Sequence, residues 1–77
     1  MREIKVLGPG CAKCKKLAEN VQAAINEAGG DFDYEYVTDI QRIIGYGILM
    51  TPGLVLDGQV VSTGRVLPVR DILNLIR

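Results

Sequence analysis

The stretch Gly8-Pro9-Gly10-Cys11-Ala12-Lys13-Cys14 separates two patterns of different period. Before it, Arg2–Leu7 alternates polar and apolar residues, several of them β-branched, which predicts a strand that the glycines and the proline end. After it, apolar residues recur on one helix face, and Gly29-Gly30 closes that helix. The residues of this face are Cys14, Leu17, Ala18, Val21, Ala24, Ile25 and Ala28. The cysteines therefore lie where a strand gives way to a helix.

A second strand and a short helix follow. Phe32–Val37 alternates aromatic residues with acids, which predicts one packed aromatic face and a place at a sheet edge, where charges discourage unwanted pairing. Thr38 or Asp39 can cap a short helix that carries apolar residues at Ile40, Ile43 and Ile44.

The last part of the chain predicts a hairpin and a final helix. Asp57-Gly58 stands between Leu54–Leu56 and Val60-Val61, which is a strong signal for a two-residue turn between antiparallel strands. Pro68 suits the first position of a helix. The apolar residues that follow at helical spacing are Val69, Ile72, Leu73 and Ile76.

The element order is thus βαβαββα. A chain of 77 residues has room for one hydrophobic core, so we expect a single domain over residues 1–77. The opening strand, helix and strand predict a right-handed parallel crossover. The sequence therefore predicts an α/β fold, in which a four-stranded mixed sheet carries helices on both faces.

Composition and charge exclude several classes of function. Nine basic and nine acidic residues give a net charge of zero, which argues against nucleic acid or an anionic membrane as the main partner. The absence of histidine excludes Ser-His-Asp and Cys-His catalysis and metal sites that need imidazole. The longest uncharged stretch, Ile43–Leu56, is broken by glycines and Pro52, so no membrane span is expected. Glu3 and Lys5 interrupt any apolar leader, so we expect a cytoplasmic protein.

The two cysteines are better explained by chemistry than by structure. A disulfide across Cys11 and Cys14 closes a very small ring and would stabilise the fold by only about 2 kcal/mol on the loop-entropy formula. A reversible dithiol/disulfide and a soft-metal site both suit the pair, since thiolates favour ions such as Cu(I). A structural zinc site would need further ligands, because zinc takes four. Two incidental helix cysteines are the third interpretation.

The element order, the Cys-x-x-Cys at the start of the first helix and three local motifs resemble the thioredoxin/glutaredoxin superfamily, and in particular its small redox-active disulfide proteins. The motifs are Gly8–Cys14, Thr51-Pro52-Gly53-Leu54-Val55 and Gly64-Arg65-Val66. The resemblance implies a minimal thioredoxin fold in which Cys11 is the nucleophile, Cys14 resolves the mixed disulfide, and Pro52 is cis beside them. With a cis bond, the Thr51 backbone would face the thiols and pair with an extended substrate, so Thr51 and Pro52 are the expected substrate-binding residues.

Three positions depart from the superfamily pattern. The spacer Ala12-Lys13 is neither the Gly-Pro of thioredoxins nor the Pro-Tyr of glutaredoxins, so no redox potential follows from the resemblance. Lys5 stands where thioredoxins carry a buried acid that helps to deprotonate the resolving thiol. The run Ser62–Arg65 stands where glutaredoxins carry glycines and an acid for glutathione, so the sequence does not predict glutathione as a partner.

Charge is unevenly distributed along the chain and favours a reactive Cys11. In the first 16 residues, five cations (Arg2, Lys5, Lys13, Lys15, Lys16) stand against Glu3, a local charge of +4. Residues 17–41 hold six acids and no Lys or Arg. The helix N-terminus and Lys13 both favour the thiolate of Cys11 and should lower the pKa of its thiol. We interpret Gly8 and Gly10 mainly as residues that permit a tight turn before the helix.

The sequence thus predicts a monomeric thiol–disulfide oxidoreductase with a role in electron transport and cell redox homeostasis. Its Cys11-Ala-Lys-Cys14 couple would exchange with a protein disulfide, with a thioredoxin-reductase-type electron donor and no cofactor beyond the couple itself. Two alternatives stay open: a soft-metal or metalloid-binding module, and an interaction domain that its disulfide switches without turnover.

Overall fold

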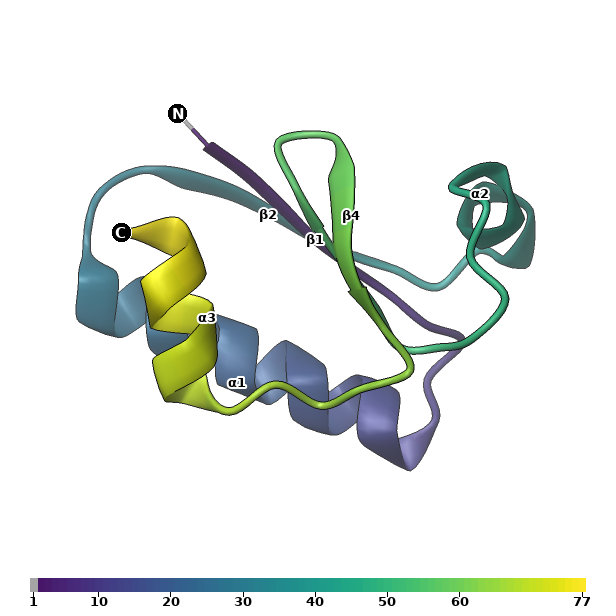
Figure 1. The fold of residues 1–77 in the computed structure, drawn as a ribbon, viewed down its shortest axis with the longest axis horizontal. Helices are drawn as coiled ribbons and strands as arrows, with labels where there is room; N and C mark the ends of the chain where they lie inside the picture. The colour runs from purple at the N-terminus through teal and green to yellow at the C-terminus, as the bar shows by residue number, and fades with distance from the viewer. Residues whose placement is uncertain (1) are drawn as a thin grey trace.

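The computed structural model describes residues 2–77, which form four strands and three helices in the predicted order (Figure 1). The elements are β1 (Arg2–Leu7), α1 (Ala12–Ala28), β2 (Phe32–Val37), α2 (Ile40–Gly45), β3 (Gly53–Leu56), β4 (Gln59–Thr63) and α3 (Val69–Ile76).

The sheet has the order β2-β1-β3-β4 and is mixed, as predicted. β1 runs parallel to β2, through the crossover made by α1, and antiparallel to β3. β2 lies at one edge, where the alternation of acids and aromatic residues had placed it. The aromatic residues of β2 form one face and pack against the main core.

The β3–β4 hairpin turns at Asp57-Gly58. Both residues have positive φ angles, 49° and 84°, which is the geometry of the two-residue turns that suit twisted hairpins. The pairing slips between Leu54 and Val55, so β4 carries a bulge. The bulge interrupts the hydrogen-bond ladder between β3 and β4, and β4 is the strand at one edge of the sheet.

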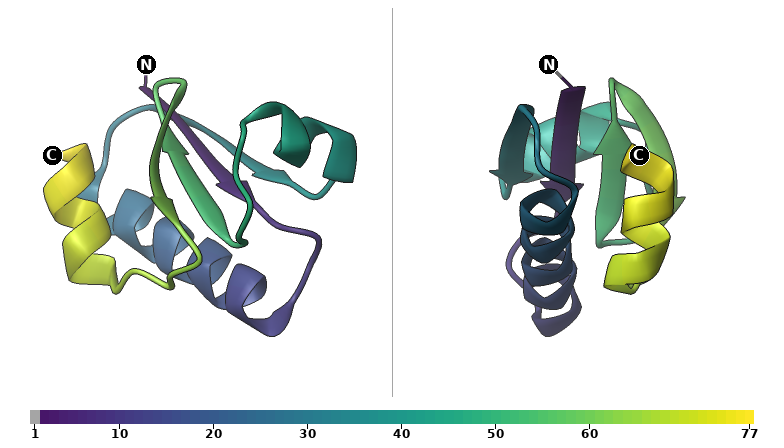
Figure 2. Two further views of the ribbon diagram at one scale, coloured as in Figure 1. Left: turned by 45° about the vertical axis from the view of Figure 1, so that its right-hand side comes forward. Right: turned by 90° about the vertical axis from the view of Figure 1, so that its left-hand side faces the viewer.

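Helices cover both faces of the sheet (Figure 2). Ile4, Val6 and Leu54 point to the face on which α1 and α3 lie side by side, and they are fully buried there. The residues that follow Val6 and Leu54 point the other way. These residues, Leu7 and Val55, pack with Ile43 of the short helix α2. β1 and β3 therefore each supply side chains to two cores by simple alternation.

The helix starts refine the sequence prediction. Cys11 is the N-cap of α1, and the helix itself begins at Ala12. Asp39, and not Thr38, caps α2 by accepting a hydrogen bond from the N–H of Gln41 at 2.9 Å. Pro68 is the N-cap of α3 and not its first helical residue, because its ψ of 159° is extended. Within residues 2–77, no helix has both the length and the apolar character needed to cross a membrane.

Candidate active site

Cys11 and Cys14 lie at the junction of β1 and α1, where the strand end and the helix start are both fixed by backbone hydrogen bonds. The two residues form a disulfide, with their Cα atoms 5.0 Å apart. As N-cap, Cys11 accepts a hydrogen bond at its Sγ from the N–H of Cys14, at 3.2 Å. The Cys11 sulfur therefore takes the place that a hydroxyl or carboxylate oxygen occupies in an ordinary cap.

The two sulfurs differ in their access to solvent. Cys11 is exposed, whereas Cys14 is 0% exposed and lies on the buried face of α1. A molecule approaching from solvent therefore meets Cys11 first.

Gly8 leaves the space that Cys14 fills. A Cβ atom added at Gly8 would lie 2.8 Å from the Cβ of Cys14 and would overlap its sulfur. The backbone of Gly8 is held in place, because its N–H donates to the carbonyl of Val37 at 2.9 Å. The sequence favours a tight turn before the helix as the role of both Gly8 and Gly10. That explanation fits Gly10, whose φ is 103° and whose added Cβ would have no atom within 4 Å. It does not account for Gly8. Sequence reasoning missed this contact, because it depends on how β1 and α1 pack against one another.

Pro52 lies beside this junction. Gly53 pairs with Leu7, so the next residues outward, Pro52 and Gly8, are neighbours across the end of the sheet. The Thr51–Pro52 peptide bond is cis, and Pro52 is fully buried, while Thr51 is partly exposed. The carbonyl of Pro52 accepts a hydrogen bond from the N–H of Gly64 at 2.7 Å. The three motifs quoted from the sequence thus meet at one end of the sheet, at the lower right of Figure 1.

Lys13, Lys15 and Lys16 are exposed on the first turns of α1, around the disulfide. Among residues 2–77, none of them is within ion-pair distance of a carboxylate. Their ammonium groups are therefore held by no ion pair within this part of the chain.

Lys5 has an acidic partner on the neighbouring strand. Lys5 and Glu35 are opposite one another in the β1–β2 register, and the Lys5 Nζ lies 3.2 Å from a carboxylate oxygen of Glu35. Hydrogen bonds from Arg42 and then from Lys5 lower the pKa of Glu35 to about 2. The hydrogen bond to Glu35 in turn raises the pKa of Lys5. Sequence reasoning missed this pair, because it depends on the register between β1 and β2.

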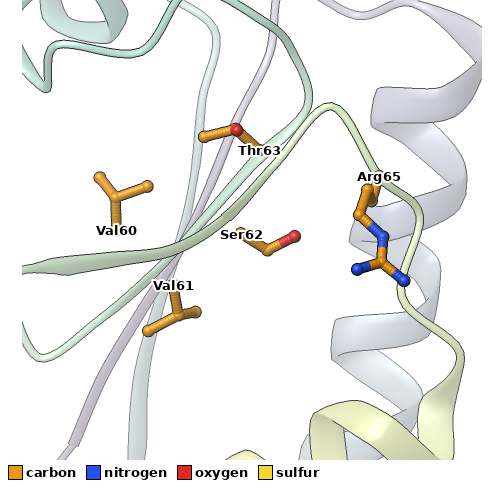
Figure 3. Close-up of a pocket in the computed structure, with 5 residues that line it drawn as sticks. All are labelled: Val60, Val61, Ser62, Thr63 and Arg65. Atoms are coloured by element: carbon orange, nitrogen blue, oxygen red, sulfur yellow. The ribbon is translucent and has the colours of Figure 1, made fainter.

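A shallow hollow of about 370 Å³ lies along β4 and is not lined by either cysteine (Figure 3). Its lining residues are Val60, Val61, Ser62, Thr63 and Arg65. In the part of the chain that the structure describes, no cluster of three or more His, Cys, Asp or Glu residues is placed to hold a metal ion. The disulfide is thus the chemically reactive group that the junction presents.

Comparison with known proteins agrees with this geometry. Residues 2–77 match the family described as thioredoxin domain. The chain is 33% identical over 76 residues to a thioredoxin of Methanothermobacter thermautotrophicus, covering 99% of each protein. It is 36% identical over 69 residues to a thioredoxin of Methanocaldococcus jannaschii, covering 90% of this chain and 79% of the other. Fold, disulfide position and sequence similarity together show that this chain belongs to the thioredoxin family.

Proposed function

We propose that the protein is a thiol–disulfide oxidoreductase that exchanges its Cys11–Cys14 couple with a disulfide of another protein. Membership of the thioredoxin family supports oxidoreductase activity in general. The observation that supports the specific roles is the difference in access: one sulfur is open to a partner and the other is buried one helical turn behind it.

The reaction of the dithiol form begins at Cys11. Its thiolate attacks one sulfur of the partner's disulfide, so that a Cys11–partner S–S bond forms and the partner's own S–S bond breaks. The first partner sulfur leaves as a thiolate and takes a proton from solvent. The N-terminus of α1 and the nearby Lys13 favour the attacking thiolate.

Cys14 completes the exchange. Its thiol loses a proton and its sulfur attacks Cys11, which forms the Cys11–Cys14 disulfide and releases the second partner sulfur as a thiolate that is then protonated. Two electrons have then passed from this protein to its partner, and the protons that the Cys11 and Cys14 thiols lose to solvent are matched by those that the two partner thiolates take from it. The buried position of Cys14 limits it to a sulfur that is already bonded to Cys11.

Thr51 and Pro52 are proposed to hold the partner chain. The partly exposed Thr51 precedes a buried proline just before the start of β3, which leaves its backbone groups open to an extended segment of the partner. Such a segment would add main-chain hydrogen bonds beside the disulfide.

The oxidised couple needs a reductant, for which we propose a two-electron donor of the thioredoxin-reductase type. We place the reaction in the cytoplasm and assign the protein no cofactor beyond its own disulfide. Turnover of a protein disulfide such as that of insulin, recycled by such a donor, tests this cycle. A protein that binds soft metal ions but does not reduce insulin would instead belong to the metal-binding alternative.

Trapping of partners tests the two cysteine roles. Cys14→Ser keeps the nucleophile and removes the resolving thiol, so partners from a lysate should accumulate as covalent complexes on a non-reducing gel. Cys11→Ser should trap none, and the double variant is the background control. Equal trapping by both single variants would contradict the assignment of nucleophile and resolving residue.

A further inference from the structure

The surface around the disulfide carries cations that form no ion pair with any acid of residues 2–77. Lys13, Lys15 and Lys16 surround the start of α1, and Arg65 follows Gly64, the residue hydrogen-bonded to Pro52. All four are exposed, and none belongs to an ion pair among the residues that the structure describes. Figure 3 shows the Arg65 side chain beyond the end of β4.

Three of the nine acidic residues lie far from the junction. Glu27, Asp31 and Asp33 are at the far end of α1 and the start of β2, which Figure 1 places at the opposite end of the molecule from the junction. A helix of 17 residues spans about 25 Å, well beyond the Debye length of about 8 Å at physiological salt. Glu19 is nearer, one helical turn from Lys15, but it pairs with none of the lysines.

Two exposed apolar side chains directly precede the cis-proline segment. Leu49 is 100% exposed and Met50 is 63% exposed, and both directly precede Thr51 and Pro52. Met50 lies against Gly64, because a Cβ added at Gly64 would be 3.1 Å from the Met50 Cε. Met50 therefore lies between the cis-proline segment and the segment that carries Arg65.

We infer that the partner protein presents its reactive disulfide on an acidic segment with an apolar side chain close to the disulfide. The inference rests on the proposed exchange function and narrows its substrate class. Complementary charge steers encounter and raises association rates, by about 10-fold to 1000-fold where the charges are close together. The apolar contact with Leu49 and Met50 would then retain the segment while the disulfides exchange.

Three synthetic peptides test the charge preference. Each has the same length and one internal disulfide beside a leucine, and the flanking positions are Glu, Gln or Lys. The second-order rate constant for oxidation of the reduced protein is measured by stopped flow at low and at physiological ionic strength. We expect the acidic peptide to react at least about 10-fold faster than the basic one at low salt, and salt to shrink the ratio.

Variants locate the preference on the structure. Lys15→Gln combined with Lys16→Gln should reduce the ratio of acidic to basic rates, whereas Arg70→Gln, which removes an exposed cation on α3, should leave it unchanged. Because the ratio is taken within one variant, any change in the reactivity of Cys11 cancels. Leu49→Ser should lower the rate constant for all three leucine peptides. It should leave the rate constant unchanged for matched peptides that carry serine in place of leucine.

The outcomes separate the two proposals. Equal rates for the three peptides would overturn the acidic-partner inference and leave the exchange function standing. A faster basic peptide would overturn it as well. Failure of the reduced protein to react with any of the peptides would overturn the proposed function and this inference with it.

Discussion

Gly8 has no side chain, and the buried sulfur of the resolving Cys14 fills the space where one would lie. We expect Gly8→Ala to destabilise the oxidised protein by about 1–3 kcal/mol, the usual cost of overpacking a well-filled site. Because the new methyl group displaces Cys14 and not Cys11, the variant should also shift the reduction potential and slow the release of a preformed mixed disulfide. Urea denaturation and equilibration with a dithiol buffer measure the two effects.

Gly45→Ala is the matched control, since no atom lies within 4 Å of the added Cβ. It should leave the reduction potential unchanged and stabilise the short helix α2 by about 0.5–1 kcal/mol. If Gly8→Ala alters stability alone, with potential and release as in the wild type, then Gly8 does not position Cys14.

The charge of Lys13 should be measurable at Cys11. Helix N-terminus and ammonium group both favour the thiolate, so the pKa of the Cys11 thiol in the reduced protein should lie below its ordinary value of about 8.5. Lys13→Gln should raise that pKa. Thiolate absorbance followed against pH in a Cys14→Ser background measures it, and a pKa at or above the ordinary value would refute this account of activation.

Some residues of the site could be predicted from the sequence and others could not. The positions of Cys11 and Cys14 and the cis geometry of Pro52 could be predicted, because local motifs resemble those of the thioredoxin/glutaredoxin superfamily. The contact of Gly8 with Cys14 depends on the packing angle between β1 and α1, which no local pattern encodes. The pair of Lys5 and Glu35 depends on the register of strands that are 30 residues apart.

At the scale of elements, α3 is the helix that completes the main core. Ile72 is 0% exposed among α1 and the sheet, whereas Leu75 on the same helix is 39% exposed. Ile72→Ala should cost about 2–5 kcal/mol of unfolding free energy, because it removes buried methyl groups and leaves a cavity. Leu75→Ala is the control and should cost less than about 1 kcal/mol. Similar losses in urea denaturation would show that α3 does not dock as described.

The element pattern was predictable because periodicity reports which side of an element is buried. The spacing of Val69, Ile72 and Ile76 identified α3, and the Asp57-Gly58 turn identified the hairpin. Where an element begins is decided by one residue's backbone, so Pro68 was misplaced by one position. The bulge in β4 has no signal in Val60-Val61, because it arises from pairing with β3.

At the scale of the whole molecule, two carboxylates join distant parts of the chain and should govern its stability in acid. Glu35 links β1, β2 and α2 through Lys5 and Arg42, and its pKa is lowered to about 2. Asp57 accepts hydrogen bonds from the N–H of Glu3 and from Arg2, which lower its pKa as well.

Both groups hold protons more weakly in the folded state than in the unfolded chain. The contribution of Glu35 is therefore complete above the ordinary pKa of its carboxyl, 4.5, and is lost as the pH falls toward about 2. The contribution of Asp57 is likewise lost as the pH falls below the ordinary pKa of its carboxyl. We expect the unfolding free energy to be flat near neutral pH and to fall across this window. Glu35→Gln and Asp57→Asn should each flatten that fall, as urea denaturation at a series of pH values would show. If the unfolding free energy of both variants falls as steeply with pH as that of the wild type, then other carboxyl groups cause the loss of stability in acid.

The central position of β1 has a consequence for the time course of folding. β1 is hydrogen-bonded on one side to β2 and on the other to β3, where Ile4 pairs with Leu56. Both β2 and β3 are far from β1 in sequence. The hydrogen bonds of β1 can therefore form only after the long chain segments between these strands have closed into loops. Chains dominated by such non-local pairings fold more slowly than helical bundles of the same size. The β3–β4 hairpin and α1 are local and can form early, whereas the β1 ladder forms late. Once the ladder has formed, we expect its amides to open only with global unfolding, so β1 should be the slowest segment to exchange hydrogen with solvent.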